Sequence, residues 1–366
     1  MQIAFVSPVN GDVLDGADGR FENGSLIVPV KISAPLGAKV TVNEKTAVFA
    51  DGLYVAEVRL DGYRNTVTAR VEIGCESAET SAVLFRFKNA RGKYRFAIDD
   101  VIWTFKDLAE KEYASVFDQP FMAIFKRLHD DFGTKIQLNL FYEDELSDFN
   151  LSMMPDRYKS EFEEAADWLK LTFHGRKNTP SRIYRFAPYQ EMYEDYVKIT
   201  REIVRFAGEK AVQSTVNGIH WGESTRDGAR ALRAVGIRCL VGSYIFDKNG
   251  DPYVAYYLNK EQTAHANTRA FWVDTAEDII FAQDSIYLNN VPPDKTAPFL
   301  DDVKKNPHLS GTINMVTHEQ FFYPWYQVYL PDYEERMRAG VRWAQENGYE
   351  PAFLDDVIQE EVKVDF

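Results

Sequence analysis

The sequence contains only two cysteines, Cys75 and Cys239, and they lie far apart in a chain of 366 residues. Two isolated thiols cannot build a disulfide framework or a cysteine-based zinc site. Long apolar runs are also missing. The longest extends from Tyr253 to Leu258, far short of the roughly 20 residues that a membrane-spanning helix needs. We therefore expect no segment that crosses a membrane.

Basic residues are scarce relative to acidic ones. The chain has 42 Lys and Arg against 56 Asp and Glu, which gives a net charge of −14. Without a basic patch, nucleic acid and anionic membrane surfaces are not expected partners. The N-terminus also lacks a basic region followed by an apolar stretch, so no secretory signal is visible. We expect a cytoplasmic protein, or a secreted one if a leader had already been removed.

Aromatic residues, in contrast, are plentiful. The sequence has 25 Phe, 20 Tyr and 6 Trp, which make up 14% of the chain. This is more than a core requires, and it indicates a surface or cleft that stacks on flat or ring-shaped ligands. At roughly 150 residues per domain, the chain length predicts two domains. The sequence does not indicate an oligomeric state.

Residues 1–88 are predicted to form an all-β domain. Short alternating or β-branched runs recur there, and turn pairs such as Asn10-Gly11 and Asp51-Gly52 separate them. The predicted strands are Ile3–Val6, Leu26–Ile32, Lys39–Val42, Tyr54–Leu60, Thr66–Ile73 and Ala82–Phe87. This spacing is typical of a small immunoglobulin-like sandwich. Such a module could bind sugar or act as a spacer.

Residues 94–366 follow a different period. About seven predicted strands alternate with helices over this stretch, a pattern that requires parallel strands with right-handed crossovers. Phe121 to Phe132 is one predicted helix, with apolar residues at helical spacing and Gly133 at its end. The length favours a distorted (β/α)7–8 barrel over an open doubly wound sheet. No glycine-rich nucleotide loop follows any strand. The predicted fold is therefore an α/β barrel preceded by a small all-β sandwich.

Acidic and imidazole side chains follow several of the predicted barrel strands. These positions are Asp99-Asp100, His174, His220 and His318-Glu319. In a β/α barrel the carboxyl ends of the strands meet at one rim, where the reactive groups lie. Imidazole nitrogen and carboxylate oxygen are ligands of a divalent ion such as zinc, which activates water. Another carboxylate can then take the proton, and an imidazole opposite can protonate the leaving group.

These motifs resemble those of the polysaccharide deacetylases, metal-dependent carbohydrate esterases on a distorted β/α barrel. The segment 94–101, Tyr-Arg-Phe-Ala-Ile-Asp-Asp-Val, is similar to their opening Asp-Asp motif. His174 is similar to the start of the second motif, 217–222 to the third, and 315–318 to the last. The resemblance covers about residues 94–358. It implies that Asp99 is the catalytic base, His318 the catalytic acid, and Asp100 and His174 metal ligands.

Two positions depart from the family pattern. The second histidine of the second motif is replaced by Asn178, and the arginine of the third motif by Gly218. Asn178 is then the remaining protein ligand for the ion, expected to be zinc, and water, His220 or His318 could fill the gap. The resemblance implies a hydrolase that removes acetyl groups from a carbohydrate by means of a metal-activated water.

Further residues near the motifs are predicted to contact the carbohydrate, by ring stacking or by polar contacts. They are Arg176, His220, Trp221, Glu319, Tyr323 and Trp325. Two other functions stay open at this point. One is a metal-free glycoside hydrolase that pairs Asp99 or Asp100 with Glu319. The other is a non-catalytic carbohydrate-binding protein on a decayed esterase barrel.

Overall fold

The computed structural model describes residues 2–362. Its chain divides into two compact units. The described residues of the first unit are 2–91, 271–280 and 359–362, and those of the second are 92–270 and 281–358. The first unit is almost entirely β, and the second mixes strands and helices.

The first unit contains two five-stranded sheets that share one apolar core. The strands are β1 (Ala4–Ser7), β2 (Val13–Leu14), β3 (Arg20–Glu22), β4 (Ser25–Ser33), β5 (Lys39–Val42), β6 (Lys45–Thr46), β7 (Val48–Ala50), β8 (Leu53–Leu60), β9 (Arg64–Ile73) and β10 (Glu76–Arg86), and the segment 271–280 adds β18 (Phe271–Asp274). One sheet has the order β1-β4-β8-β7 with β3 beside β4, and the other has the order β2-β10-β9-β5-β6.

Alternation of side chains explains why these strands form two layers. Along β8, Tyr54, Ala56, Val58 and Leu60 are buried, while the residues between them are more exposed. Because successive side chains of a strand point to opposite faces, this period-two pattern buries one face only. Residues of β4 and β8 share their hydrophobic cluster with residues of β5, β9 and β10, so the two sheets pack face to face.

The second unit is built on a parallel sheet whose strands are buried on both faces. Its order is β13 (Leu169–Gly175), β12 (Ile136–Phe141), β11 (Lys93–Val101), β21 (Thr312–His318) and β20 (Ile286–Tyr287), and β22 (Glu350–Pro351) pairs with the start of β11. All of these pairs are parallel. The register places Asp99 opposite His318, so the carboxyl ends of the two central strands carry both residues to the same edge.

A second sheet of this unit contains β14 (Val216–Asn217), β15 (Cys239–Gly242) and β19 (Ile279–Gln283) as neighbours. After β19 the chain continues into β20. Backbone hydrogen bonds join this connection to β15 of the second sheet and to β21 of the main sheet. The amide of Asp284 donates to Gly242 at 2.8 Å, and the amide of Ser285 donates to Asn314 at 2.8 Å. A short hairpin, β16 (Ile245–Phe246) and β17 (Pro252–Tyr253), follows β15.

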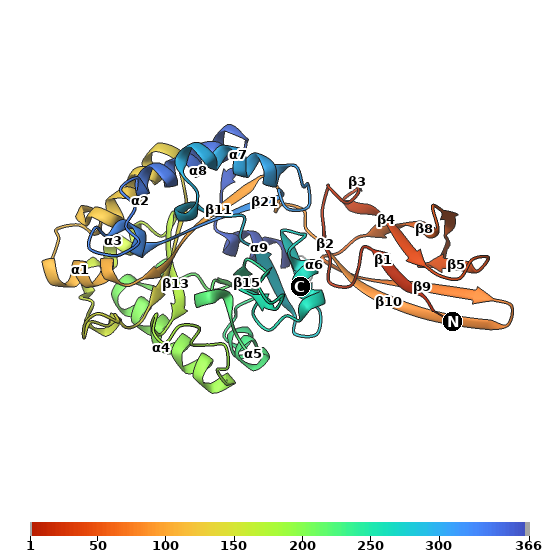
Figure 1. The fold of residues 1–366 in the computed structure, drawn as a ribbon, viewed down its shortest axis with the longest axis horizontal. Helices are drawn as coiled ribbons and strands as arrows, with labels where there is room; N and C mark the ends of the chain where they lie inside the picture. The colour runs from red at the N-terminus through yellow and green to blue at the C-terminus, as the bar shows by residue number, and fades with distance from the viewer. Residues whose placement is uncertain (1, 363–366) are drawn as a thin grey trace. The chain divides into compact units, whose positions relative to one another are not determined.

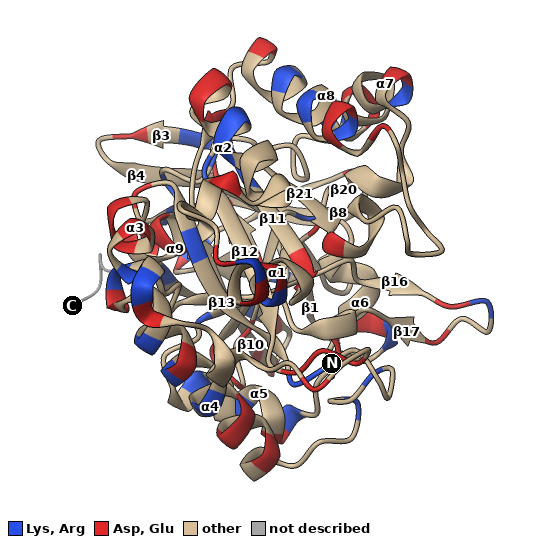
Figure 2. Cartoon of the chain, turned by 90° about the vertical axis from the view of Figure 1, so that its left-hand side faces the viewer, with Lys and Arg blue, Asp and Glu red and all other residues tan. Residues whose placement is uncertain are grey.

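The helices belong mostly to the second unit, where they lie around its strands (Figure 1). They are α1 (Trp103–Lys111), α2 (Pro120–Phe132), α3 (Lys159–Glu164), α4 (Tyr189–Ala207), α5 (Arg226–Ala234), α6 (Lys260–Ala266), α7 (Pro293–Lys304), α8 (Tyr333–Glu346) and α9 (Leu354–Val362). Short 3-10 turns occur at Val116–Asp118, Leu151–Met153, Asp156–Tyr158, Glu209–Ala211, His220–Gly222, Leu288–Asn290 and Glu319–Phe322. Figure 2 shows many charged residues along α4 and α8, whereas the strands of the main sheet carry few.

Helix α2 shows how the local sequence sets these boundaries. Pro120 occupies the first turn, where its missing N–H costs nothing, and Gln119 accepts a hydrogen bond from the Met122 amide. Gly133 ends the helix with a φ of 67°, a conformation that glycine adopts without strain. The helix predicted from Phe121 to Phe132 is therefore confirmed.

The predicted closed barrel is present only in part. Among residues 2–362 the strands of the second unit fall into separate sheets, and their pairing does not close into one ring. The architecture that the structure supports is a mixed α/β unit with a parallel central sheet. Within the same range, none of the helices combines the length and the apolar composition that crossing a membrane requires.

Candidate functional site

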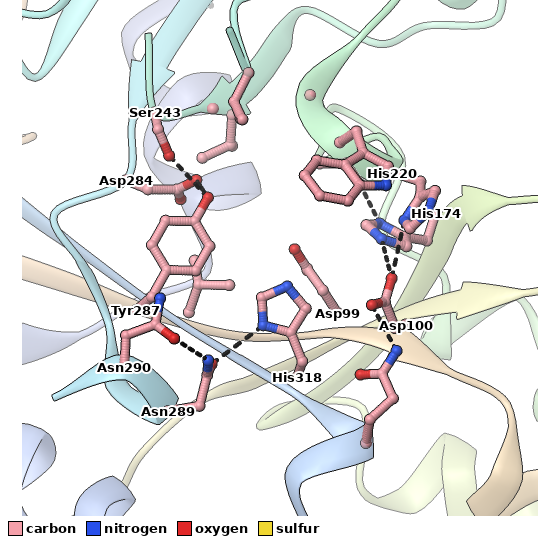
Figure 3. Close-up of a pocket in the computed structure, with 18 of the residues that line it drawn as sticks. Asp99, Asp100, His174, His220, Ser243, Asp284, Tyr287, Asn289, Asn290 and His318 are labelled. Carbon is pink, nitrogen blue, oxygen red and sulfur yellow. Dashed lines mark hydrogen bonds and ion pairs between the residues drawn. The ribbon is translucent and has the colours of Figure 1, made fainter. Parts of the chain in front are cut away.

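The end of β11 delivers two consecutive carboxylates to a pocket of the second unit. The pairing of β11 with β12 shifts register between Ile98 and Val101, and Asp100 has a φ of 62° in the left-handed region. Without this irregularity, consecutive side chains of a strand would point to opposite faces. Asp99 and Asp100 instead both line the pocket, and Asp100 turns toward two histidines (Figure 3).

Asp100, His174 and His220 form a compact buried cluster. Oδ1 of Asp100 lies 2.9 Å from Nε2 of His174 and 3.0 Å from Nδ1 of His220. Their ligand atoms all lie within 4.8 Å of one another. The other carboxylate oxygen of Asp100 accepts a 2.7 Å hydrogen bond from Nε2 of Gln320. Two imidazole nitrogens and one carboxylate oxygen are a donor set suited to zinc or a similar divalent ion.

Hydrogen bonding sets the orientation of His174 within this cluster. Nδ1 of His174 lies 2.6 Å from the carbonyl oxygen of Gly218. A carbonyl only accepts, so Nδ1 carries a proton, and Nε2 carries one as well when it donates to the Asp100 carboxylate. Loss of the Nε2 proton would leave a lone pair there for an ion. Metal-binding histidines are commonly held in this way by a backbone carbonyl. Nε2 of His220 is buried and has no hydrogen-bond partner. The cluster therefore fits a cation.

Mutual electrostatic stabilisation holds Asp100 ionised. Burial raises the pKa of its carboxyl group, but the hydrogen bond of His174 and the charge of His220 outweigh this and leave the pKa well below its ordinary value. Burial likewise lowers the pKa of His174, while the charges of Asp99 and Asp100 raise it above its ordinary value overall. The excess negative charge of the two carboxylates thus favours a positive partner, either a proton or a metal ion.

Asp99 is held by a chain of buried amide groups. Nδ2 of Asn139 donates to Oδ1 of Asp99 at 2.5 Å, and Nε2 of Gln137 donates to Oδ1 of Asn139 at 2.6 Å. Nε of Arg95 in turn donates to Oε1 of Gln137 at 2.8 Å. These three residues lie on β11 and β12 and are almost fully buried. The chain fixes the Asp99 carboxylate and links it to a guanidinium group.

His318 lies at the end of β21, opposite Asp99 in the strand register. Its Nδ1 lies 3.1 Å from Oδ1 of Asn289, and its ring stacks on Tyr287 with 5.8 Å between centroids and an interplanar angle of 20°. Figure 3 shows His318 and Asp99 between the Asp100 cluster and the side chains around Tyr287.

These groups surround one pocket with a volume of about 740 Å³. Among its lining residues are all the predicted catalytic and metal-binding positions, namely Asp99, Asp100, His174, Asn178 and His318. The amide nitrogen of Asn178 donates to Oε1 of Glu145 at 2.8 Å. His220, which we expected to contact substrate, instead lies within the cluster of Asp100 and His174. Trp221 lines the pocket as well, with 38% of its surface exposed.

Glu319 was predicted to contact substrate, but it is not among the described residues that line the pocket. Its side chain is fully buried and accepts hydrogen bonds from the amides of Ile102, Trp103 and Thr104 at 2.8, 2.8 and 2.6 Å. These amides begin α1, where free N–H groups need acceptors. Burial raises the pKa of Glu319 to about 7, and the three amides act in the opposite direction. We therefore assign Glu319 a structural capping role.

The other predicted contacts lie outside the main pocket. Tyr323 and Trp325 line a neighbouring hollow of about 240 Å³ together with Trp103 and Lys106. Trp325 is 58% exposed, and its ring centroid lies 4.5 Å from that of Trp103. Arg176 is not among the residues that line either of these spaces in the described part of the chain.

Sequence reasoning missed several residues of the site. Four of them line the pocket, namely Arg95, Ser243, Asp284 and Tyr287. The fifth is Asn139, which contacts Asp99. Tyr287 donates to Oδ2 of Asp284 at 2.9 Å, and its oxygen lies 2.9 Å from Oγ of Ser243. A signal for Arg95 and Asn139 was present, because each is a polar residue between apolar neighbours in a predicted strand. Buried polar residues at such positions need partners.

No known protein family matches the sequence, and no curated protein matches it. Some solved structures are similar at low identity. A Bacteroides fragilis protein assigned as an α-galactosidase is 10% identical with a TM-score of 0.28, and the match covers 94% of this chain and 78% of that one. A β-glucuronidase from Parabacteroides merdae is 11% identical with a TM-score of 0.26, with 81% and 45% covered.

A further Bacteroides fragilis protein, assigned as a β-galactosidase, is 10% identical with a TM-score of 0.27, with 89% and 51% covered. The chain thus spans about half of the length of the last two proteins. All three names denote glycoside hydrolases, which act on carbohydrates. Likenesses with TM-scores this low carry no conclusion about the activity of this chain.

Proposed function

We propose that this protein is a metal-dependent hydrolase that acts on a carbohydrate. The observation that carries this proposal is the buried cluster of Asp100, His174 and His220 beside Asp99 and His318 in one pocket. Asp100, His174 and His220 would hold the ion, with Asn178 as a further oxygen donor. A bound divalent ion would supply Lewis acidity, which activates water and polarises the bond to be cleaved.

Asp99 is the general base in this proposal. Its carboxylate has its hydrogen bond from Asn139 on Oδ1, which orients the group and leaves Oδ2 to accept a proton from water. His318 is the general acid. The contact of its Nδ1 with Asn289 and the stacking on Tyr287 fix the ring, so that Nε2 can deliver a proton to the leaving group. Both roles agree with those that the resemblance to the deacetylases implies.

The pocket supports a sugar as the ligand. A volume of about 740 Å³ lies in the range of small-molecule sites. Its wall combines the aromatic rings of Trp221 and Tyr253 with polar groups such as those of Asn289 and Ser243. Sugars offer an apolar ring face for the former and hydroxyl groups for the latter. Removal of an acetyl group, attached through nitrogen or oxygen, is the reaction that we propose first.

We also propose a fold that joins the described sheets. Nδ2 of Asn217 on β14 donates to the carbonyl oxygen of Phe173 on β13 at 2.6 Å, and Ser285 links β19 to β21. These bonds support one distorted β/α barrel in the described part of the predicted domain 94–366. The strand orders β1-β4-β8-β7 and β2-β10-β9-β5-β6 support an immunoglobulin-like sandwich in the described part of the predicted domain 1–88.

Activity measurements with and without a chelator test the proposed function. Purified protein is assayed on N-acetylated chitooligosaccharides, acetylated xylan and p-nitrophenyl glycosides. We expect release of acetate that stops on chelation and returns with zinc, and a loss of at least about 100-fold in Asp100→Ala. The exposed variant Asp302→Asn serves as the control. Activity that a chelator and Asp100→Ala both leave unchanged would rule the proposal out.

Cleavage of a glycosidic bond by two carboxyl groups is the second candidate. Asp99 and Asp284 both line the pocket, and burial raises the pKa of Asp284 to about 7, with the charge of Asp99 adding to this rise. An acid kept protonated near an ionised carboxylate is the pairing that glycosidases use. This function predicts hydrolysis of p-nitrophenyl glycosides that is insensitive to chelation and lost in Asp284→Asn.

A further inference from the structure

The guanidinium group of Arg95 and the carboxyl group of Asp284 approach each other in the pocket lining without forming a hydrogen bond. Arg95 reaches the pocket from β11, and Asp284 from the segment after β19. Their side chains are only 3% and 7% exposed. Nη1 of Arg95 lies 3.8 Å from Oδ1 of Asp284, which exceeds the usual length of an N–H···O hydrogen bond. The pair therefore attracts electrostatically while both atoms lack a direct partner.

Each of the two side chains is anchored through its other polar atoms. Nε of Arg95 donates to Oε1 of Gln137 at 2.8 Å, and Oδ2 of Asp284 accepts from the hydroxyl of Tyr287 at 2.9 Å. The remaining atoms, Nη1 of Arg95 and Oδ1 of Asp284, are buried and have no hydrogen-bond partner. Buried polar atoms are costly to leave unpaired. Nη1 of Arg95 thus offers a fixed donor next to a fixed acceptor, Oδ1 of Asp284.

The chemistry of this pair selects one kind of ligand group. A carboxylate or phosphate could accept from Arg95, but an ionised Asp284 would repel it. An ammonium group could donate to Asp284, but Arg95 would repel it. A secondary amide in the trans form presents its oxygen and its N–H on opposite edges. A hydroxyl group, in contrast, accepts and donates through one atom, which matches a donor and an acceptor less than 4 Å apart.

We propose that Arg95 and Asp284 form a hydroxyl-binding subsite that selects the sugar accepted by the pocket. That the ligand of this subsite is a carbohydrate rests on the proposed function. One ring hydroxyl accepts a hydrogen bond from Nη1 of Arg95 and donates one to Oδ1 of Asp284. Because a site built to bind a hydroxyl leaves its own groups unpaired when that hydroxyl is missing, it discriminates strongly against the deoxy analogue.

Calorimetric binding of sugars to the full chain tests this subsite. The probes are the methyl glycosides of glucose, galactose and N-acetylglucosamine, each with its set of monodeoxy analogues. In the wild type we expect removal of one particular hydroxyl to weaken binding about tenfold or more, and removal of the others to matter less. The exposed variant Asp302→Asn should behave as the wild type does.

A double variant, Arg95→Met with Asp284→Leu, identifies where that hydroxyl binds. Replacing both partners by apolar groups avoids leaving one buried charge alone. We expect this variant to bind the parent sugar and the sensitive deoxy analogue with equal affinity. If it does not fold, as thermal unfolding will show, a crystal structure of the wild type with the parent sugar replaces it, and a hydroxyl between the two side chains is then expected.

The outcomes separate the subsite from the proposed function. Discrimination that survives in the double variant, wild-type binding that no single hydroxyl affects, or a sugar bound away from Arg95 and Asp284 overturns the subsite alone. Binding of none of the probes to the wild type overturns the subsite together with the carbohydrate as ligand. Discrimination that vanishes in the double variant, in a protein without metal or hydrolysis, supports the subsite and overturns the proposed function.

Discussion

Nδ2 of Asn139 donates a 2.5 Å hydrogen bond to Oδ1 of Asp99. A Cβ at Gly218 would lie 3.5 Å from Nδ2 of Asn139 and 3.9 Å from Nη2 of Arg95. The contact to Asp99, the proposed base, comes from β12, and it connects Asp99 to Arg95 through Gln137.

Removing this contact should impair catalysis by leaving Asp99 less well positioned. We expect Asn139→Ala to lower kcat at least about tenfold with little change in KM, because Asn139 positions Asp99 and does not touch substrate. A hydrogen bond to the ionised form favours that form, so its loss should also move the acid limb of the kcat profile to higher pH. The exposed variant Asn249→Ala is the control. An unchanged pH profile would contradict the role of Asn139.

The structure offers His220 as a metal ligand, and this can be separated from the role of Asn178. We expect His220→Ala to lose most of its bound zinc after dialysis, because it removes one of three clustered donors. Asn178→Ala should retain most of the metal, because the three clustered donors remain and a neutral amide oxygen is the weaker ligand for zinc. Elemental analysis measures both. Zinc retained in His220→Ala and lost in Asn178→Ala would reverse the assignment.

Asp284 should make stability depend on pH. Burial raises its pKa from 3.8 to about 7, so the folded state binds a proton more tightly than the unfolded state does. The resulting stabilisation is complete below about pH 4 and is lost as the pH rises through about 7, with an upper bound of about 4 kcal/mol. Relative to Asp284→Asn, the wild type should lose stability over this window. Urea unfolding at about pH 5 and about pH 8 measures it, and parallel changes in the two proteins would refute it.

Trp325 should matter for long substrates only. It is exposed beside Trp103 in the hollow next to the main pocket, where a sugar unit beyond the reacting one could stack. We expect Trp325→Ala to raise KM for an oligosaccharide about three- to tenfold and to leave KM for a single-sugar substrate unchanged. Phe299→Ala, which removes an exposed ring on α7, is the matched control. Equal changes in KM for both substrates would contradict a role of Trp325 in binding the second sugar unit.

The parts of the site that could be predicted are those that follow from strand ends. Asp99, Asp100, His174 and His318 each come at or near the end of a strand, and parallel strands bring their carboxyl ends to one edge. The register of β11 and β21, which sets Asp99 opposite His318, then completes the placement. The role of Glu319 could not be predicted this way, because a short 3-10 turn carries its carboxylate under α1.

Residues inside the strands were harder to interpret. Arg95 and Asn139 are polar residues between apolar neighbours, and a single sequence does not show which buried partners satisfy them. Asp284 follows β19, and its burial depends on packing with Arg95 and Tyr287, which the order of residues does not show.

Anomalous diffraction from crystals grown with zinc tests the central claim most directly. Data collected on both sides of the zinc absorption edge locate the ion without any assumption about substrate. We predict one strong peak within coordination distance of Asp100, His174 and His220, and its absence in Asp100→Asn. A peak bound elsewhere, or no peak at these three side chains in the wild type, would contradict the account.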